Sequence, residues 1–148
     1  MSISLDASHV LLGRERRSKQ DVIREIGERM VAFGEVTPRY AEGMLEKEEQ
    51  CSTWITEGVA LPHGTNAVKD EILQDSVVVA QLPQGVDWGD GKLVYLAIGL
   101  AGKGTEQHLK LLSGLAAVLQ HKDKVDRLIR TRDASEVIAI LADSEPGS

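Results

Sequence analysis

The sequence predicts a single α/β domain whose strands and helices pack in layers. Three observations support this fold class. The 148 residues fit one domain with one substantial core, and the composition, 42% apolar and 27% charged, is typical of globular proteins. Segments with strand and helix periodicity alternate along the chain, without an internal repeat or a dividing linker. We therefore expect one domain over residues 1–143, followed by a flexible tail over residues 144–148.

The first third of the chain is expected to form a short strand and two helices. The strand is predicted at Ser8 to Leu12. Ser18 is then a plausible N-cap, and apolar residues at helical spacing continue to Phe33, where Gly34 offers a C-terminal stop. The second helix opens with Thr37-Pro38, an N-cap followed by proline at the first helical position.

Extended structure is expected in the middle of the chain. The segment from Trp54 to Leu61 is predicted to be one extended stretch, which breaks at Pro62-His63-Gly64. Two further strands are predicted at Ser76 to Leu82 and at Leu93 to Leu100. Turn residues separate these two strands, at Pro83-Gln84-Gly85 and Gly89-Asp90-Gly91.

The C-terminal part is expected to be helical. Thr105 is interpreted as the N-cap of a helix with a leucine stripe, which would place His108 at the third helical position. A further helix is predicted to open at Asp123. The last is predicted to begin at Asp133 or Ser135.

Charge and composition exclude several classes of function. The net charge of -6 argues against a nucleic-acid surface, which needs a basic excess. Cys51 is the only cysteine, so an internal disulfide or a thiolate metal cage is excluded. The chain has no apolar run long enough for a membrane span, and its first ten residues do not resemble a secretory signal. We therefore expect a cytoplasmic protein that is not inserted into a membrane.

Of the four histidines, His63 has the most informative surroundings. His121 is interpreted as a helix-end residue and His9 as a structural one. His63 stands at a Pro-His-Gly break at the end of an apolar strand, where proline fixes the backbone and glycine allows another group to approach closely. The alternative is a histidine with an ordinary role in a turn.

His108 adds a second candidate because it lies in the first turn of a predicted helix. That end of a helix favours an anion such as a phosphoryl group, and it disfavours an imidazolium ion. If the rings of His63 and His108 meet, the first can attack phosphorus while the second stabilises the phosphoryl oxygens. The attacking ring needs one free nitrogen and one held by a hydrogen bond. The alternative for His108 is a core histidine beside the leucine stripe.

Metal binding is a competing use of the same residues. His63, His108 and Glu57 could supply three zinc ligands, but no closely spaced pair of ligands makes this assignment specific. The sequence also lacks a Walker-type loop and a dinucleotide-binding fingerprint. We therefore expect neither a metal nor a cofactor.

The segment from Gly58 to Thr65, followed by Val68-Lys69-Asp70, resembles a known phosphorylation-site signature. The signature is that of enzyme IIA domains of the mannitol/fructose class in the bacterial phosphoenolpyruvate-dependent sugar phosphotransferase system. The similarity is greatest to the mannitol-type branch, and it covers most of the chain. It extends to Leu11-Leu12-Gly13, Pro38-Arg39-Tyr40, Met44-Leu45, Gln81 to Val86, Glu106-Gln107-His108 and Ser135-Glu136-Val137. The resemblance implies an αβα domain with a mixed central sheet flanked by helices.

The resemblance also implies a function and its partners. His63 would accept phosphate from phospho-HPr and pass it to a cysteine of enzyme IIB. With the membrane-bound enzyme IIC, that partner would phosphorylate a sugar, mannitol or a related polyol, during uptake. His108 matches the second active-site histidine of the sugar-specific branch, which nitrogen-regulatory relatives generally lack. A regulatory module whose phosphorylation state controls partner binding is the alternative function, and a metal-assisted hydrolase is the third hypothesis.

Four further residues are expected to support the phosphate site. Glu57, Gly64 and Thr65 match family positions in or near the signature. Lys47 stands where the mannitol branch has an arginine, so the positive charge is kept but the planar fork that grips two phosphate oxygens is lost.

Overall fold

The computed structural model describes residues 5–15 and 18–142. The tail predicted over residues 144–148 lies outside the described residues. The helices are α1 (Lys19–Ala32), α2 (Pro38–Gln50), α3 (Thr105–Leu119), α4 (Lys122–Arg130) and α5 (Ala134–Ala142), with short 3₁₀ helices η1 (Ala7–His9) and η2 (Asn66–Glu71). The strands are β1 (Val10–Leu11), β2 (Trp54–Thr56), β3 (Gly58–Ala60), β4 (Ser76–Asp87) and β5 (Leu93–Ala101).

The strands form one mixed sheet in the order β1-β4-β5-β3-β2. The central pair β4 and β5 is antiparallel, whereas β1 lies parallel to β4 and β3 lies parallel to β5. β2 is antiparallel to β3 and forms one edge of the sheet. Because β3 and β5 run in the same direction, the segments that follow them leave the sheet at the same end.

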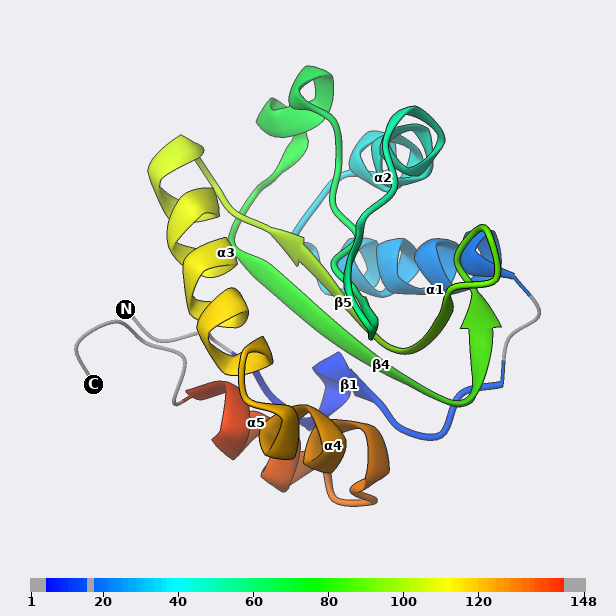
Figure 1. Ribbon diagram of the computed structural model, residues 1–148. Helices are drawn as coiled ribbons and strands as arrows, with labels where there is room; N and C mark the ends of the chain where they lie inside the picture. Colours follow the sequence, from blue (N-terminus) through cyan, green and yellow to red (C-terminus); the bar gives the residue numbers. More distant parts are fainter. Residues whose placement is uncertain (1–4, 16–17, 143–148) are drawn as a thin grey trace.

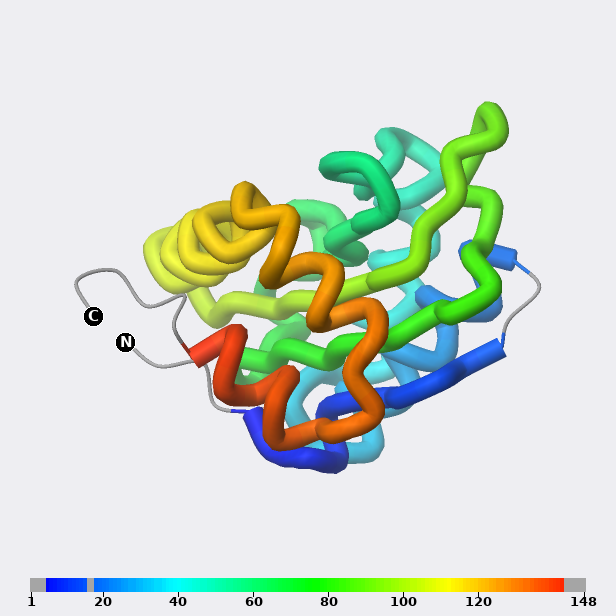
Figure 2. Tube along the Cα trace, turned by 60° about the horizontal axis from the view of Figure 1, so that its bottom comes forward, coloured from blue at the N-terminus to red at the C-terminus, as the bar shows by residue number. Residues whose placement is uncertain are grey.

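Helices cover both faces of this sheet, as the predicted αβα class requires (Figure 1). Alternate residues of β4 enter different cores: Val78 packs with residues of α1 and α2, whereas Val79 packs with residues of α3, α4 and α5. Figure 2 shows the C-terminal helices, yellow to red, on the near side of the green strands and the N-terminal helices on the far side. None of the helices among the described residues is long and apolar enough to cross a membrane.

The capping residues predicted for the first two helices are confirmed in part. The hydroxyl of Ser18 accepts a hydrogen bond from the backbone N–H of Asp21, and Gly34, with a φ of 72°, follows the end of α1 as predicted. Thr37 does precede Pro38 at the start of α2, but its side chain makes no capping bond. Its hydroxyl instead donates to Glu71, 2.6 Å away in η2.

Three predictions for the extended segments need correction. The stretch from Trp54 to Leu61 is a hairpin of β2 and β3, because the chain turns at Gly58, which has a φ of 80°. β4 continues through the turn predicted at Pro83-Gln84-Gly85, and this irregular part appears as a shift in register. The first strand contains only Val10–Leu11, because η1 precedes it.

Two predicted helix starts also need correction. Gly104, with a φ of 87°, is the N-cap of α3, so Thr105 occupies the first helical position. His108 is therefore one position further along than predicted, and its backbone N–H donates to the carbonyl of Gly104 at 3.0 Å. α4 begins after His121, one residue before Asp123. For α5 the predicted Asp133 is confirmed, because its carboxylate accepts the N–H of Ser135 at 2.9 Å.

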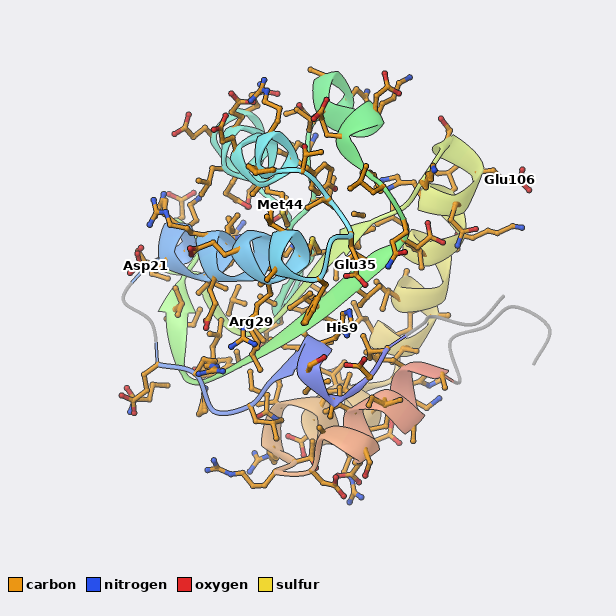
Figure 3. All side chains as sticks on the ribbon, turned by 180° about the vertical axis from the view of Figure 1, so that it is seen from behind. His9, Asp21, Arg29, Glu35, Met44 and Glu106 are labelled. Atoms are coloured by element: carbon orange, nitrogen blue, oxygen red, sulfur yellow. The ribbon has the colours of Figure 1, made fainter. Side chains whose placement is uncertain are left out.

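His9 has the structural role expected of it. Its ring is buried, with Nδ1 at 3.0 Å from Asp6 and Nε2 at 3.0 Å from Glu35, which follows α1. The ring also stacks on Phe33. Figure 3 shows His9 and Glu35 pointing toward one another. This contact fastens η1 to the end of α1, away from the residues expected to carry chemistry.

Candidate active site

A cavity of about 780 Å³ lies at the end of the sheet where β3 and β5 finish. Five of the six expected site residues line it: Lys47, His63, Gly64, Thr65 and His108. The other lining residues are Tyr40, Glu46, Gln50, Asn66, Ala67, Lys69, Asp70, Ile72, Gly102, Gly104 and Thr105. The cavity is therefore formed by α2, the segment after β3, η2 and the beginning of α3.

His63 and His108 meet in this cavity, although different layers of the fold bring them there. β3 leads to His63, and the parallel strand β5 leads through Gly102 into α3 and His108. The ring centroids lie 5.6 Å apart, and the ring planes are inclined by 57°. The tilted arrangement lets the two imidazoles share one small ligand rather than stack on each other. The two rings therefore meet, which is the condition for the division of roles considered from the sequence.

The protonation state of the His63 ring follows from its contact with Leu61. Nδ1 of His63 lies 2.8 Å from the backbone carbonyl oxygen of Leu61. A carbonyl oxygen only accepts hydrogen bonds, so Nδ1 carries the proton and donates it. In the neutral ring, Nε2 then holds the free lone pair. Leu61 is the hydrogen-bond partner that the sequence alone did not identify.

Both histidines are held in the neutral form near neutral pH. Burial lowers the pKa of His63 below its ordinary value, the bond to Leu61 opposes this shift, and the charge of Lys47 lowers the pKa further. Burial, followed by proximity to His63, lowers the pKa of His108 as well. A neutral imidazole is nucleophilic at its free nitrogen, whereas a protonated one is not.

The surroundings favour an anion beside the two rings. Lys47 lines the cavity on one side, and Gly104 and Thr105 bring the N-terminal end of α3 to the other. The hydroxyl oxygen of Thr65 is buried and has no hydrogen-bond partner among the described residues. A phosphoryl group in this cavity would therefore meet the positive charge of Lys47 and the N-terminal end of α3.

Glu57 is the expected site residue that the structure places elsewhere. It lies at the turn between β2 and β3, at the opposite end of β3 from His63, and it is exposed. It does not line the cavity. The zinc set of His63, His108 and Glu57 is therefore not assembled, and no cluster of three metal-ligating side chains occurs within residues 5–15 and 18–142.

Tyr40 is a lining residue to which sequence reasoning gave no role in the site. It is 2% exposed, and its hydroxyl lies 2.9 Å from the backbone nitrogen of Gly64, directly after His63. It lies on the buried face of α2 among core residues, where an aromatic side chain is ordinarily part of the packing. A contact between a helix and a loop far along the chain leaves no local signal in the sequence.

Comparison with known proteins gives the same assignment across the whole domain. The family described as "Phosphoenolpyruvate-dependent sugar phosphotransferase system, EIIA 2" matches residues 3–144. The mannitol-specific EIICBA component of Vibrio cholerae is 35% identical over 143 residues, which are 95% of this chain and 22% of that protein. The multiphosphoryl transfer protein of Escherichia coli O157:H7 is 39% identical over 129 residues, which are 87% of this chain and 34% of that protein. The chain thus spans between about a fifth and a third of these relatives.

Solved structures agree in fold. The crystal structure of IIA mannitol from Escherichia coli is 35% identical with a TM-score of 0.87, and the match covers 95% of this chain and 100% of that one. The complex of enzyme IIA and phosphorylated enzyme IIB of the mannitol system from the same organism also gives a TM-score of 0.87, at 34% identity, covering 94% of this chain and 97% of the matched chain. With the family match over residues 3–144, these findings establish that the chain belongs to the EIIA 2 family of the phosphoenolpyruvate-dependent sugar phosphotransferase system.

Proposed function

We propose that this chain is a phosphoryl carrier that takes phosphate from phospho-HPr onto Nε2 of His63 and passes it to a cysteine of enzyme IIB. One observation carries the proposal: the free nitrogen of His63 belongs to a neutral ring beside His108 in an open cavity. Family membership supports the reaction class. The relatives named as mannitol-specific support mannitol or a related polyol as the sugar taken up through enzymes IIB and IIC.

The proposed reaction is two displacements at phosphorus. In the first, the lone pair of His63 Nε2 attacks the phosphorus of the phosphohistidine on HPr. A new P–N bond forms while the bond to the donor ring breaks, and the donor ring keeps that electron pair. In the second, a thiolate of enzyme IIB attacks the same phosphorus, and Nε2 recovers its lone pair. The proton on Nδ1 remains at the Leu61 carbonyl through both steps.

The other cavity residues act on charge and position. Phosphoryl transfer depends mainly on alignment and on stabilising charge over the phosphoryl oxygens. A neutral His108 can donate one N–H to such an oxygen, and Lys47 can contribute a positive charge. Gly64 and Thr65 follow His63 directly in the chain. The N–H of Gly64 already donates its hydrogen bond to the Tyr40 hydroxyl, so it is not a donor to the phosphoryl group. Glu57 has no role in this proposal because it does not line the cavity.

The partners determine where the reaction takes place. Because we propose exchange with HPr and with enzyme IIB, we place the protein in the cytoplasm, in transient contact with each partner. Several relatives carry further components in one chain, as the name EIICBA indicates. The proposal concerns the reaction of this domain and does not depend on whether its partners are separate chains.

The reconstituted phosphate relay tests the proposal. The protein is incubated with phosphoenolpyruvate, enzyme I and HPr, and its intact mass is measured before and after enzyme IIB is added. A carrier gains one acid-labile, base-stable phosphoryl group on His63 and loses it when enzyme IIB arrives. A protein that gains the group but never discharges it to enzyme IIB is the regulatory module. Stoichiometric zinc without phosphorylation contradicts both and supports the hydrolase.

A further inference from the structure

The segment that holds His63 is fastened on both sides to a single residue of β5. Before the histidine, the carbonyl of Pro62 accepts the backbone N–H of Leu100 at 3.0 Å. After it, the N–H of Gly64 donates to the hydroxyl of Tyr40, which in turn donates to the carbonyl of Leu100, both at 2.9 Å. The first tie is a direct backbone bond, whereas the second passes through a side chain of α2.

Leu100 is well placed to transmit this restraint to the other histidine. It stands next to the last residue of β5, and Gly102 follows directly before the turn into α3. A Cβ at Gly102 would lie 2.5 Å from Cα and 2.7 Å from N of His108, so the strand end and the helix backbone are in close contact. The position of His108 is therefore fixed relative to Leu100 on one side, as that of His63 is on the other.

We propose that Tyr40 is a positioning residue for phosphoryl transfer, because its hydroxyl sets the position of the His63 segment relative to the strand that carries His108. The inference rests on the proposed function and adds a residue to it. Tyr40 does not act on the phosphoryl group itself, since both hydrogen bonds of its hydroxyl go to backbone atoms and the side chain is buried.

The chemistry of the hydroxyl fits this role. Burial raises the pKa of Tyr40 to about 12, although its bond with Gly64 opposes the shift, so the hydroxyl keeps its proton at any working pH. It can therefore donate to one backbone group and accept from another at the same time. Its oxygen accepts the hydrogen bond from the Gly64 N–H at 2.9 Å.

The packing around Gly64 points the same way. A Cβ at Gly64 would meet Tyr40 Cε1 at 2.7 Å and Val68 Cγ2 at 2.9 Å, so the phenol ring lies directly against the backbone beside His63. Glycine at this position lets the hydroxyl reach the N–H. The contact between Tyr40 of α2 and the His63 segment therefore requires glycine at position 64.

The main test is the variant Tyr40→Phe, which keeps the ring and removes the hydroxyl. The rate of phosphorylation by phospho-HPr at saturation should fall by about tenfold to a hundredfold, because small displacements of reacting groups have effects of this size. The concentration of phospho-HPr at half-saturation should stay within about twofold, since the hydroxyl is buried away from any docking partner. Amide exchange at Gly64 should accelerate, while that at Leu61, whose N–H is held by Thr53, should not.

A matched control separates positioning from stability. Gln81→Met also removes side-chain hydrogen bonds, two donated to the carbonyls of Leu128 and Thr131 and one accepted from the N–H of Gly13, but at the α4 side of the sheet. It should lower the free energy of unfolding and leave the saturated phosphorylation rate within about twofold of wild type. Gly64→Ala serves as the second variant, because its methyl group pushes the ring from the segment while the hydroxyl remains.

The outcomes are distinguishable. Saturated rates within about twofold of wild type for both Tyr40→Phe and Gly64→Ala would overturn the inference. So would unchanged amide exchange at Gly64 in Tyr40→Phe, or an equal loss of rate in Gln81→Met. If wild type accepts no phosphate at all, the proposed function fails instead. The NMR signals of Gly64 and of the His63 ring then still decide whether Tyr40 holds the segment.

Discussion

The ring centroids of His63 and His108 lie 5.6 Å apart, with the planes tilted by 57°. His63 lies in the segment that follows β3, and His108 lies near the start of α3. Local structure alone therefore does not bring the two rings together. The spacing leaves room for a phosphoryl group that bonds to one ring and accepts a hydrogen bond from the other. Five predictions follow from this site and from the buried pair at His9.

His63→Gln should abolish phosphorylation by phospho-HPr, because glutamine offers no nucleophilic nitrogen at the Nε2 position. Intact-mass measurement after incubation with phosphoenolpyruvate, enzyme I and HPr checks this. His121→Gln is the control, since His121 is exposed at the start of α4 and makes no capping bond. Labelling of the His63 variant would assign the phosphate to another residue.

His108→Ala should fold and still accept phosphate on His63, but onward transfer to enzyme IIB should slow by about a hundredfold or more. The loss arises because the phosphoryl oxygens lose a hydrogen-bond donor as their charge redistributes. Rapid-quench measurement of discharge gives the rate, with His121→Ala as the control. Discharge at the wild-type rate would remove His108 from the mechanism.

The pH dependence should follow the lowered pKa values of the two histidines. Because burial lowers the pKa of His63 below the ordinary 6.5, the ring stays neutral and nucleophilic as the pH falls past that value. Phosphate acceptance should therefore remain constant through pH 6.5 and decline only at lower pH. NMR titration of the ring protons checks the assignment, and a midpoint above 6.5 for His63 would contradict it.

Lys47→Met should raise the pKa of His63, because the lysine charge is one of the causes that lower it. The same variant should reduce the phosphorylation rate by about tenfold, less than the loss of a fully buried oxyanion donor. Lys47→Arg should retain the wild-type rate or exceed it, since arginine restores the planar fork. Lys122→Met, on the exposed surface of α4, is the control. An unchanged titration midpoint in Lys47→Met would exclude an electrostatic role.

His9→Ala should lower the free energy of unfolding by about 2–3 kcal/mol near pH 6, because it removes a charged partner from the buried carboxylate of Glu35, which keeps its hydrogen bond from Ser76. Burial lowers the pKa of His9, but hydrogen bonds to Asp6 and Glu35 outweigh it, so the net shift is upward. The stability that this pair contributes is fully present below the unfolded pKa near 6.5, and it is lost as the pH rises through the raised value.

Denaturant unfolding at several pH values checks this prediction. The difference between wild type and His9→Ala should shrink as the pH increases. Asp6→Asn is the comparison variant, because Asp6 is exposed and solvent screens its pairing with His9, so it should lower stability less than His9→Ala does. A difference that grows with pH would mean that the ring of His9 is neutral in the folded protein.

The sequence was sufficient for the fold class and for naming five candidate residues that line one cavity, because those features depend on local patterns. The apolar run of β4 and the Pro-His-Gly break each occupy a few consecutive residues, and a family signature surrounds the break. The hairpin turn at Gly58 was missed because the residues on both sides have the same strand character. The turn at Glu57 and the positive φ of Gly58 separate β2 from β3.

Other features, such as the first residue of α3 and the contacts around His63, depend on the tertiary structure and not on the local preferences of the residues. Thr105 is the better N-cap by residue type, yet the backbone enters α3 through Gly104, whose positive φ makes a sharp approach from β5. Glu57 matched a family position but lies at the far end of β3 from the cavity. The hydroxyl of Tyr40 and the carbonyl of Leu61 act through contacts that exist only after folding.

The hydrogen bond between His63 and Leu61 also affects how readily the loaded ring gives up its cargo. Once Nε2 carries phosphorus, a proton retained on Nδ1 gives the phosphorylated ring a positive charge, so the ring departs as neutral, weakly basic imidazole. Leu61 keeps that proton in place, so departure of the ring need not wait for a proton from bulk water. The loaded protein is consequently suited to relay phosphate immediately, and poorly suited to store it.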